Sequence, residues 1–258
     1  MTITSTHNEK LTQIRKLQQR RRWRERAGRF VAEGEDLLAA ADAAGWPALE
    51  RYCVARSGLA GVEVEPEVLA SVSELGSGTR ALGVYEERWA LEPLGPLCVY
   101  LHGVSDPGNV GTVLRSAQAF GASSVALGQG SADPFGPKAV RASMGAVFAV
   151  PLVRAPALTD LPGTTIALVA GAGTPLAELW RSGSEGLNQN AKVGEAAPDV
   201  GASRGGVTLL IGAERGGLPE ELVAGADFVA QIPIYSHSLN AAMAATVALY
   251  EVTRMAPG

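Results

Sequence analysis

The chain has 258 residues, of which 47% are hydrophobic and 19% charged, proportions typical of a globular protein. It contains no apolar run of the roughly 18 residues that a membrane-spanning helix needs, and its first ten residues lack the apolar core of a signal peptide. Its two cysteines, Cys53 and Cys98, are isolated, which fits a reducing compartment and gives no metal-ligand spacing. These features predict a cytoplasmic protein with no membrane anchor and no bound metal.

The net charge of −4 is unevenly distributed along the chain. Residues 10–29 carry nine basic side chains and one acidic residue, Glu25, so this segment alone has a net charge of +8. A basic block on an otherwise acidic chain indicates a polyanion partner, and the planar guanidinium of arginine suits phosphate well. A solvated helix face is the alternative, but such a face would carry more acidic side chains. The predicted nucleic-acid contacts are Arg15, Arg20, Arg21, Arg22, Arg24, Arg26 and Arg29.

The first predicted elements, in chain order, form a small α/β domain. A helix over residues 9–27 places Leu11, Ile14, Leu17 and Trp23 on or near one stripe. It is followed by a strand at 30–33, a helix at 35–44, a strand at 51–55, a helix at 66–73 and a strand at 80–85. We assign residues 1–88 to this domain and the proline- and glycine-rich residues 89–96 to a linker.

Strands and helices alternate from residue 97 onward. The predicted strands are 97–103, 124–127, 146–151, 165–170, 207–212 and 228–233. The predicted helices between and after them are 109–120, 137–144, 175–180, 219–224 and 238–254. Most of these strands are continuous apolar runs, as expected for parallel strands that are buried on both faces. We therefore predict an α/β domain with an open parallel sheet over residues 97–258, with a flexible insertion at 181–206.

Three segments of this domain place polar residues directly after a predicted strand. They are residues 106–115, 211–219 and 232–240. Each has a plain structural interpretation when taken alone: Asn109 or Ser238 as a helix cap, and residues 212–217 as a turn. Because the carboxyl ends of parallel strands meet at one edge of a sheet, the three segments are expected to converge there on a ligand. No Gly-x-Gly-x-x-Gly fingerprint follows the first strand, which argues against a dinucleotide oxidoreductase.

The three segments together resemble the signature motifs of the SpoU/TrmH-type RNA ribose 2′-O-methyltransferases of the SPOUT superfamily. The motifs are Asn-x-Gly-x-x-x-Arg from Asn109, Gly-x-Glu-x-x-Gly from Gly212, and Ile-Pro…Ser-Leu-Asn from Ile232, followed by a helix of small residues ending in Leu-Tyr-Glu. The basic segment 17–35 is similar to the L30e-like substrate-binding domain that precedes the methyltransferase domain in many rRNA-modifying members. The resemblance implies an α/β domain with a deep C-terminal trefoil knot and a smaller L30e-like domain before it.

The resemblance also implies S-adenosyl-L-methionine as the methyl donor and a ribose 2′-hydroxyl as the acceptor. The implied cofactor-binding residues are Leu127, Gly128, Ala170, Gly171, Ile211, Gly212, Ile232, Ile234, Ser238 and Leu239. The family gives Arg115 the central catalytic role, with Asn109, Glu214, Ser238 and Asn240 positioning it and the ribose. Since arginine is essentially never deprotonated in proteins, we expect Arg115 to bind the target phosphate and orient the hydroxyl. His237 is a weaker candidate for contact with substrate or cofactor.

The resemblance further implies a homodimer that completes the cofactor cleft, and an RNA partner. The two-domain layout favours 23S rRNA, and some members with this layout confer resistance to ribosome-targeting antibiotics. Two alternatives stay open on the sequence alone: a tRNA 2′-O-methyltransferase, and a catalytically inert RNA-binding protein of the same fold.

Overall fold

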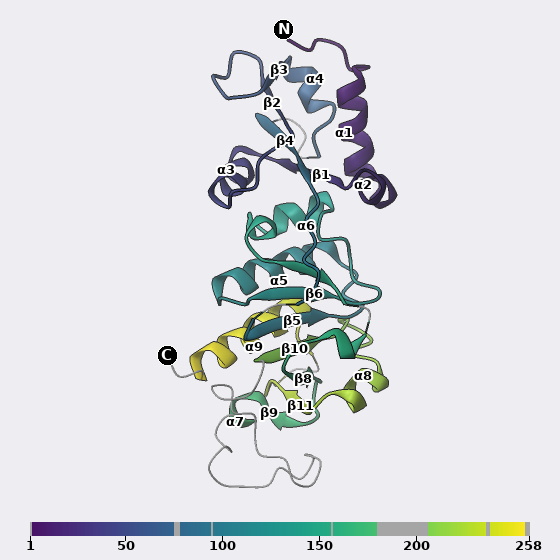
Figure 1. The fold of residues 1–258 in the computed structure, drawn as a ribbon, viewed down its shortest axis with the longest axis vertical. Coiled ribbons are helices and arrows are strands. Elements are labelled where there is room, and N and C mark those ends of the chain that lie inside the picture. The colour runs from purple at the N-terminus through teal and green to yellow at the C-terminus, as the bar shows by residue number, and fades with distance from the viewer. Residues whose placement is uncertain are drawn as a thin grey trace. The chain divides into compact units, whose positions relative to one another are not determined.

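The computed structural model describes residues 2–74, 78–93, 95–155, 157–179, 206–235 and 238–255. The chain divides into two compact units (Figure 1). The first unit comprises Met1–Arg88 and Asp133–Ala149, and the second comprises Trp89–Ala132 and Val150–Gly258. The predicted insertion at 181–206 lies, except for Gly206, outside the described residues, as does His237. The linker at 89–96, the L30e-like character of the N-terminal domain and the trefoil knot stay predictions.

The first unit is built around a four-stranded sheet with the order β1-β4-β2-β3. Its strands are β1 (Arg29–Glu33), β2 (Glu50–Val54), β3 (Val62–Val64) and β4 (Ala81–Glu86). Its helices are α1 (Glu9–Gln19), α2 (Arg21–Ala27), α3 (Glu35–Ala43), α4 (Pro66–Ala70) and α6 (Pro137–Ala142), with a 3₁₀ turn at Ala146–Phe148. β4 pairs antiparallel with β1 and β2, whereas β3 pairs parallel with β2. Helices α1 and α3 flank the sheet on opposite sides (Figure 1).

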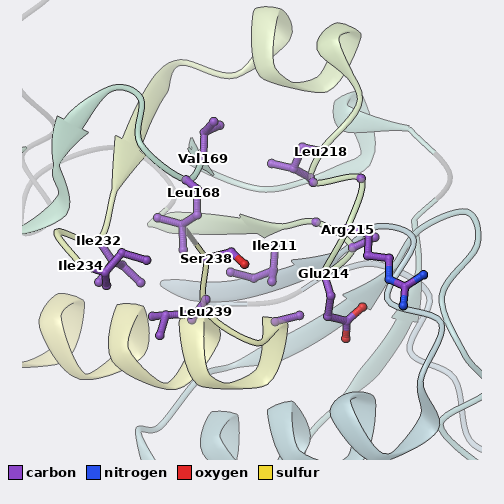
Figure 2. Close-up of a pocket in the computed structure, with 17 residues that line it drawn as sticks. Leu168, Val169, Ile211, Glu214, Arg215, Leu218, Ile232, Ile234, Ser238 and Leu239 are labelled. Carbon is purple, nitrogen blue, oxygen red and sulfur yellow. The ribbon is translucent and has the colours of Figure 1, made fainter. Parts of the chain in front are cut away.

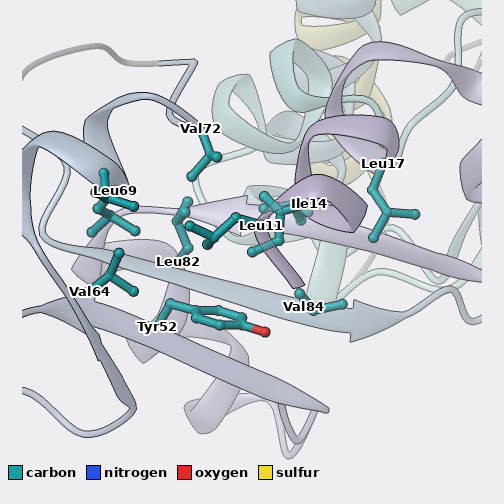
Figure 3. Close-up of a cluster of buried hydrophobic side chains, with 11 residues drawn as sticks. Leu11, Ile14, Leu17, Tyr52, Val64, Leu69, Val72, Leu82 and Val84 are labelled. Atoms are coloured by element: carbon teal, nitrogen blue, oxygen red, sulfur yellow. The ribbon is translucent and has the colours of Figure 1, made fainter. Parts of the chain in front are cut away.

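Each face of this sheet carries its own packed core. On one face, Leu11, Ile14 and Leu17 of α1 pack into a buried cluster with Tyr52, Val84 and other side chains of the sheet and of α4 (Figure 3). On the other face, the ring of Phe30 lies 4.8 Å from that of Phe135 and 5.8 Å from that of Phe148, measured between centroids. Segment 133–149 therefore belongs to the core of the first unit, although it is distant from residues 1–88 in sequence.

The first unit differs from the sequence prediction in three places. The predicted helix at 9–27 is broken at Arg20, whose extended backbone (φ −137°, ψ 120°) separates α1 from α2. The short strand β3 was not predicted, because three residues are too few to show an alternating pattern. The predicted strand at 146–151 is wrong: Ala146–Phe148 form a buried 3₁₀ turn, and the strand β7 begins at Leu152. An apolar run is buried in either conformation, so its hydrophobicity does not distinguish them.

Arg24 lies inside the first unit and not on its surface. Its Nη2 lies 2.7 Å from Asp133 Oδ2, and the two side chains are only 6% and 13% exposed. Its Nη1 donates to the carbonyl oxygens of Leu17 at 2.6 Å and of Gln18 at 3.2 Å. The guanidinium therefore joins the C-terminal end of α1 to segment 133–149.

The second unit contains a seven-stranded sheet that is parallel throughout, with the order β7-β6-β5-β10-β8-β11-β9. Its strands are β5 (Leu97–Leu101), β6 (Ser124–Leu127), β7 (Leu152–Arg154), β8 (Thr164–Leu168), β9 (Thr174–Pro175), β10 (Val207–Ile211) and β11 (Phe228–Gln231). Its helices are α5 (Pro107–Ala119), α7 (Leu176–Leu179), α8 (Glu220–Gly225) and α9 (Ala241–Met255), with a 3₁₀ turn at Leu158–Asp160. The predicted α/β class with a parallel sheet is confirmed.

The strand order explains where a ligand site forms in the second unit. The chain runs from β5 outward to β6 and β7 on one side, whereas β10 and β8 lie on the other side of β5. All residues of β5 and β10 are buried, as their continuous apolar sequences require. A reversal of strand order opens a crevice at the carboxyl ends of the strands, and the polar segments lie at these ends. Within the described residues, no helix has the length and apolar character to cross a membrane.

We expect Arg24→Met to destabilise the protein by about 3–5 kcal/mol, because the change leaves the Asp133 carboxylate buried without its partner. Urea unfolding measures this loss. Arg21→Met is the matched control, since Arg21 loses only an exposed pair with Glu25 and such pairs contribute less than about 1 kcal/mol. Adding Asp133→Asn to Arg24→Met removes the buried charge and should recover part of the stability. Equal losses for Arg24→Met and Arg21→Met would show that the buried pair does not hold the unit together.

Candidate functional site

A cavity of about 410 Å³ lies at the carboxyl ends of β8, β10 and β11 in the second unit (Figure 2). Its walls are largely apolar side chains and backbone, with Glu214, Arg215 and Ser238 as the polar side chains. The lining residues are Leu168, Val169, Ala170, Ile211, Gly212, Ala213, Glu214, Arg215, Gly216, Gly217, Leu218, Ile232, Ile234, Ser238, Leu239, Ala241 and Ala244. A cavity lined by apolar side chains and backbone, with a few polar side chains, is typical of a site for a small organic ligand.

The loop after β10 is closed tightly on itself. Ala213 and Gly217 exchange two backbone hydrogen bonds, of 3.1 Å and 2.9 Å. A Cβ atom on Gly212 would lie 2.2 Å from the carbonyl carbon of Gly217, and Gly217 itself has a left-handed backbone (φ +62°). Both glycines of the Gly-x-Glu-x-x-Gly motif are thus required by the turn that forms one wall of the cavity.

Three polar side chains from distant segments form one hydrogen-bonded chain beside this loop. Asn240 Nδ2 donates to Asn109 Oδ1 at 3.0 Å, and Asn109 Nδ2 donates to Glu214 Oε1. They come from the start of α9, the start of α5 and the loop after β10. We call this set the Asn109–Glu214–Asn240 chain. It joins all three polar segments that the sequence predicts to converge.

The capping arrangement leaves Asn109 available for this role. The sequence suggested Asn109 itself as a helix cap, but α5 begins earlier, and Asp106 is its cap. Asp106 Oδ1 accepts from the backbone N–H groups of Gly108 at 2.6 Å and Asn109 at 3.2 Å. Asn240 caps α9 through its Oδ1, which accepts from Ala242 N at 2.9 Å, so α9 begins at Ala241 and not at Ser238. The side-chain amide of Asn240 remains available for Asn109.

A second, more open cavity of about 570 Å³ adjoins the chain of polar side chains. It is lined by Ser105, Asp106, Asn109, Ala213, Glu214, Arg215 and Asn240. Glu214 and Arg215 border both cavities. The arrangement therefore offers two adjoining compartments, one for each of two ligands, and the Glu214 carboxylate borders both.

The structure places most of the predicted cofactor-binding residues around the 410 Å³ cavity. Those that line it are Ala170, Ile211, Gly212, Ile232, Ile234, Ser238 and Leu239. Leu127, Gly128 and Gly171 are not among its lining residues. Leu127 ends β6, which is separated from β10 by β5, and this position explains its distance from the cavity.

Of the two predicted catalytic residues outside the Asn109–Glu214–Asn240 chain, Ser238 lines the 410 Å³ cavity. Arg115 is the one that the described structure places at neither cavity. It is exposed on α5 and lines neither cavity. Six residues of helix separate it from Asn109, which corresponds to about 9 Å along the axis and roughly 240° around it. Its guanidinium therefore projects from another face of α5 than the Asn109 amide.

Several lining residues were not predicted individually. Leu168 and Val169 were missed because β8 ends at Leu168, two residues before the predicted end of that strand. Ala213, Arg215 and Gly216 lie between the motif residues that were quoted, so the motif itself was the signal that could have identified them. Ala241 and Ala244 begin α9, and their small side chains carry no chemical signal in the sequence.

The predicted nucleic-acid contacts lie in the first unit and differ in their availability. Arg24 is buried against Asp133, and Arg15 donates to Thr6 O at 2.8 Å and to Ser71 Oγ at 2.9 Å. Arg21 pairs with Glu25 on the surface. The remaining predicted contacts are exposed: Arg20, Arg22, Arg26 and Arg29.

Comparisons with known proteins agree with this geometry. The model of the SpoU rRNA Methylase family matches residues 96–250. A 23S rRNA (uridine(2479)-2'-O)-methyltransferase of Streptomyces viridochromogenes is 33% identical over 197 residues, which cover 74% of this chain and 61% of that protein. In other curated relatives the match spans about half of their length.

Two solved structures match nearly the whole chain. The AdoMet-bound rRNA methyltransferase of Sinorhizobium meliloti has a TM-score of 0.80 and 29% identity, covering 100% of this chain and 99% of that one. The SpoU methyltransferase AviRb of Streptomyces viridochromogenes, in complex with AdoMet, has a TM-score of 0.77 and 26% identity, covering 96% and 98%. Because the family model spans more than half of the sequence and includes all three polar segments, the chain belongs to the SpoU rRNA methylase family.

Proposed function

We propose that the protein transfers a methyl group from S-adenosyl-L-methionine to a ribose 2′-hydroxyl of RNA, and that its substrate is 23S rRNA. The observation that carries this proposal is the Asn109–Glu214–Asn240 chain at the border of two adjoining cavities, in a chain of the SpoU family. A relative named as a 23S rRNA 2′-O-methyltransferase and an AdoMet-bound relative support the substrate and the cofactor.

The residues of the 410 Å³ cavity fit S-adenosylmethionine. The volume lies within the roughly 300–1,000 Å³ of sites for molecules of this size. Leu168, Ile211 and Leu239 offer apolar surface for an adenosine, and the glycine loop exposes backbone groups that can read its edge. Glu214 borders both cavities and would supply a carboxylate to attract the positively charged sulfonium. When bound, the cofactor supplies an electrophilic methyl group.

The protein's own residues contribute mainly by positioning. The Asn109–Glu214–Asn240 chain holds three polar side chains in fixed orientations beside the acceptor compartment, and correct placement of two reactants can supply much of the rate. We assign to Arg115 the binding of the target phosphate and the orientation of the 2′-hydroxyl. Because the guanidinium keeps its own protons, Arg115 acts by orienting the hydroxyl and not as the base that accepts its proton.

A homodimer is part of this proposal. Met243, Val247 and Tyr250 lie on one face of α9, at helical spacing, and are exposed. The opposite face of α9 is buried through Ala245, Leu249 and other small or apolar residues. A second copy covering the exposed stripe would remove apolar surface from water. It would also give Arg115, which lines neither cavity of its own chain, a partner site on which to act.

The first unit supports RNA as the macromolecular substrate. Its exposed arginines Arg20, Arg22, Arg26 and Arg29 lie close together in the sequence, and phosphate contacts by such side chains contribute strongly to the affinity for nucleic acids. The two-unit layout and the relative named as a 23S rRNA methyltransferase support rRNA over tRNA. We also infer a cytoplasmic location, which the free cysteines Cys53 and Cys98 support.

We expect Arg115→Ala to abolish methyl transfer to 23S rRNA and to leave the affinity for S-adenosylmethionine unchanged. The physical reason is that Arg115 contacts the acceptor strand and not the cofactor cavity. Transfer of a radiolabelled methyl group measures the first effect and calorimetry the second. Full activity in this variant would contradict the assignment of Arg115, and loss of cofactor binding would place it in the cofactor site instead.

We expect Gly212→Ala to weaken S-adenosylmethionine binding at least tenfold. The new methyl group would overlap the Gly217 carbonyl and force open the loop that forms the cavity wall. Gly216→Ala is the matched control in the same loop, because a Cβ there meets no atom within 4 Å. Calorimetry on both variants tests the expectation, which fails if the two bind the cofactor equally well.

We expect the protein to be a dimer in light scattering and Val247→Glu to convert it to a monomer without activity. A charge in the exposed stripe of α9 would have to be buried if a second copy covers it. Leu91→Glu is the control, since Leu91 is a fully exposed apolar residue outside α9. A wild-type monomer, or an active Val247→Glu variant, would contradict the shared site.

A further inference from the structure

The first unit contains a cavity of about 250 Å³ that the methyltransferase site does not use. It lies where α1 passes into α2, over one end of the sheet face that α1 covers. Its lining residues are Lys10, Gln13, Ile14, Lys16, Leu17, Trp23, Ala27, Arg29, Glu50, Tyr52 and Val84. Figure 3 shows four of these, Ile14, Leu17, Tyr52 and Val84, as part of the packed cluster, so the floor of the cavity is rigid core.

The wall of the cavity that belongs to α2 carries an indole ring with two cations close to it. Trp23 is half-buried, and Lys16 Nζ lies 4.9 Å from the centroid of its ring. The guanidinium carbon of Arg26 lies 5.9 Å from the same centroid. An aromatic face bordered by cations is the arrangement that single-stranded nucleic acids meet in proteins, because bases stack on the ring and phosphates meet the charges.

The opposite wall carries a single carboxylate, Glu50. Its Oε2 lies 3.2 Å from Lys10 Nζ and accepts from the Tyr52 hydroxyl, whereas no hydrogen bond to Oε1 is present among the described residues. The hydrogen bond from Tyr52 lowers the pKa of this carboxyl against the opposing effect of burial, and Lys10 lowers it further. The side chain is 31% exposed. An ionised acceptor therefore faces a cavity whose other charged lining residues, Lys10, Lys16 and Arg29, are all basic.

We propose that this cavity binds one unpaired nucleotide of the RNA substrate, with the base against Trp23 and a flanking phosphate on Lys16 or Arg29. The inference rests on the proposed function, because it takes the substrate to be RNA. The volume is below the range for whole cofactors and suits a single base. Sequence-specific recognition of RNA typically uses unpaired bases that stack on aromatic side chains and form hydrogen bonds along their edges.

Glu50 gives the cavity a preference among bases. A carboxylate only accepts hydrogen bonds, so it selects a base edge that donates. Guanine, adenine and cytosine carry an exocyclic amino group, whereas uracil presents carbonyl oxygens on both sides of its single ring N–H. The cavity should therefore favour an amino-bearing base over uracil.

The test measures binding of full-length protein to fluorescent RNA by anisotropy, with a single-stranded oligonucleotide and a duplex of equal length. Trp23→Ala should weaken binding of the single strand by roughly 5- to 100-fold and leave duplex binding nearly unchanged. Trp23→Phe keeps an aromatic ring for stacking and should lose much less affinity for the single strand. Trp89→Ala is the matched control, because Trp89 also lies under an arginine (Arg154) but is not part of this cavity.

Equal affinity of Trp23→Ala and wild type for the single strand would overturn the proposal. Equal losses of affinity for the single strand and the duplex would overturn it as well, because they would indicate a general phosphate-binding surface. Glu50→Gln supplies an independent readout if Trp23→Ala does not fold. It should reduce the preference for cytidine over uridine oligonucleotides several-fold, and an unchanged preference would also count against the cavity. Calorimetry with S-adenosylmethionine on the wild type separates the two proposals. Absence of cofactor binding contradicts the methyltransferase. Unchanged affinity of the Trp23→Ala variant for single-stranded RNA contradicts only the nucleotide site.

Discussion

The arrangement of the site depends on the side chain of Asn109, which connects two other segments through hydrogen bonds. It donates to Glu214 and accepts from Asn240, residues that lie 105 and 131 positions further along the chain. It can do so only because Asp106 satisfies the first N–H groups of α5 and releases the amide of Asn109 from capping. The parallel sheet contributes by bringing the carboxyl ends of its strands to one edge.

The 410 Å³ cavity depends on backbone geometry more than on side-chain chemistry. Gly212 has no room for a Cβ beside Gly217, and the loop between them closes on itself through two backbone hydrogen bonds. The turn gives the wall its shape, whereas Ile211 and Leu239 give it apolar character. Selectivity for an adenosine in such a site must come from backbone groups held in place, because few polar side chains face the cavity.

The sequence predicts the second unit well and the first unit less well, for a physical reason. Strands β5 and β10 are buried along their whole length, so each produces an apolar run that is hard to mistake. The run at 146–151 is equally apolar but packs as a turn against Phe30, and burial alone does not distinguish a strand from a 3₁₀ turn. The break at Arg20 was also invisible, because the helical stripe continues on both sides of it. The motifs located the site, but only the structure separates Arg115 from the other motif residues.

In the basic segment 10–29, the net charge of the sequence overstates how many cationic side chains are available to bind a partner. Folding itself uses part of the positive charge: Arg24 neutralises a buried aspartate and caps the end of α1, and Arg15 holds a loop carbonyl. The cations that remain exposed are not spread evenly, since Lys16 and Arg26 both lie against the ring of Trp23. A surface that only attracted phosphate would need no aromatic ring among its charges and no carboxylate opposite it. The combination of Trp23 with Glu50 therefore argues that this part of the first unit reads a base as well as a backbone.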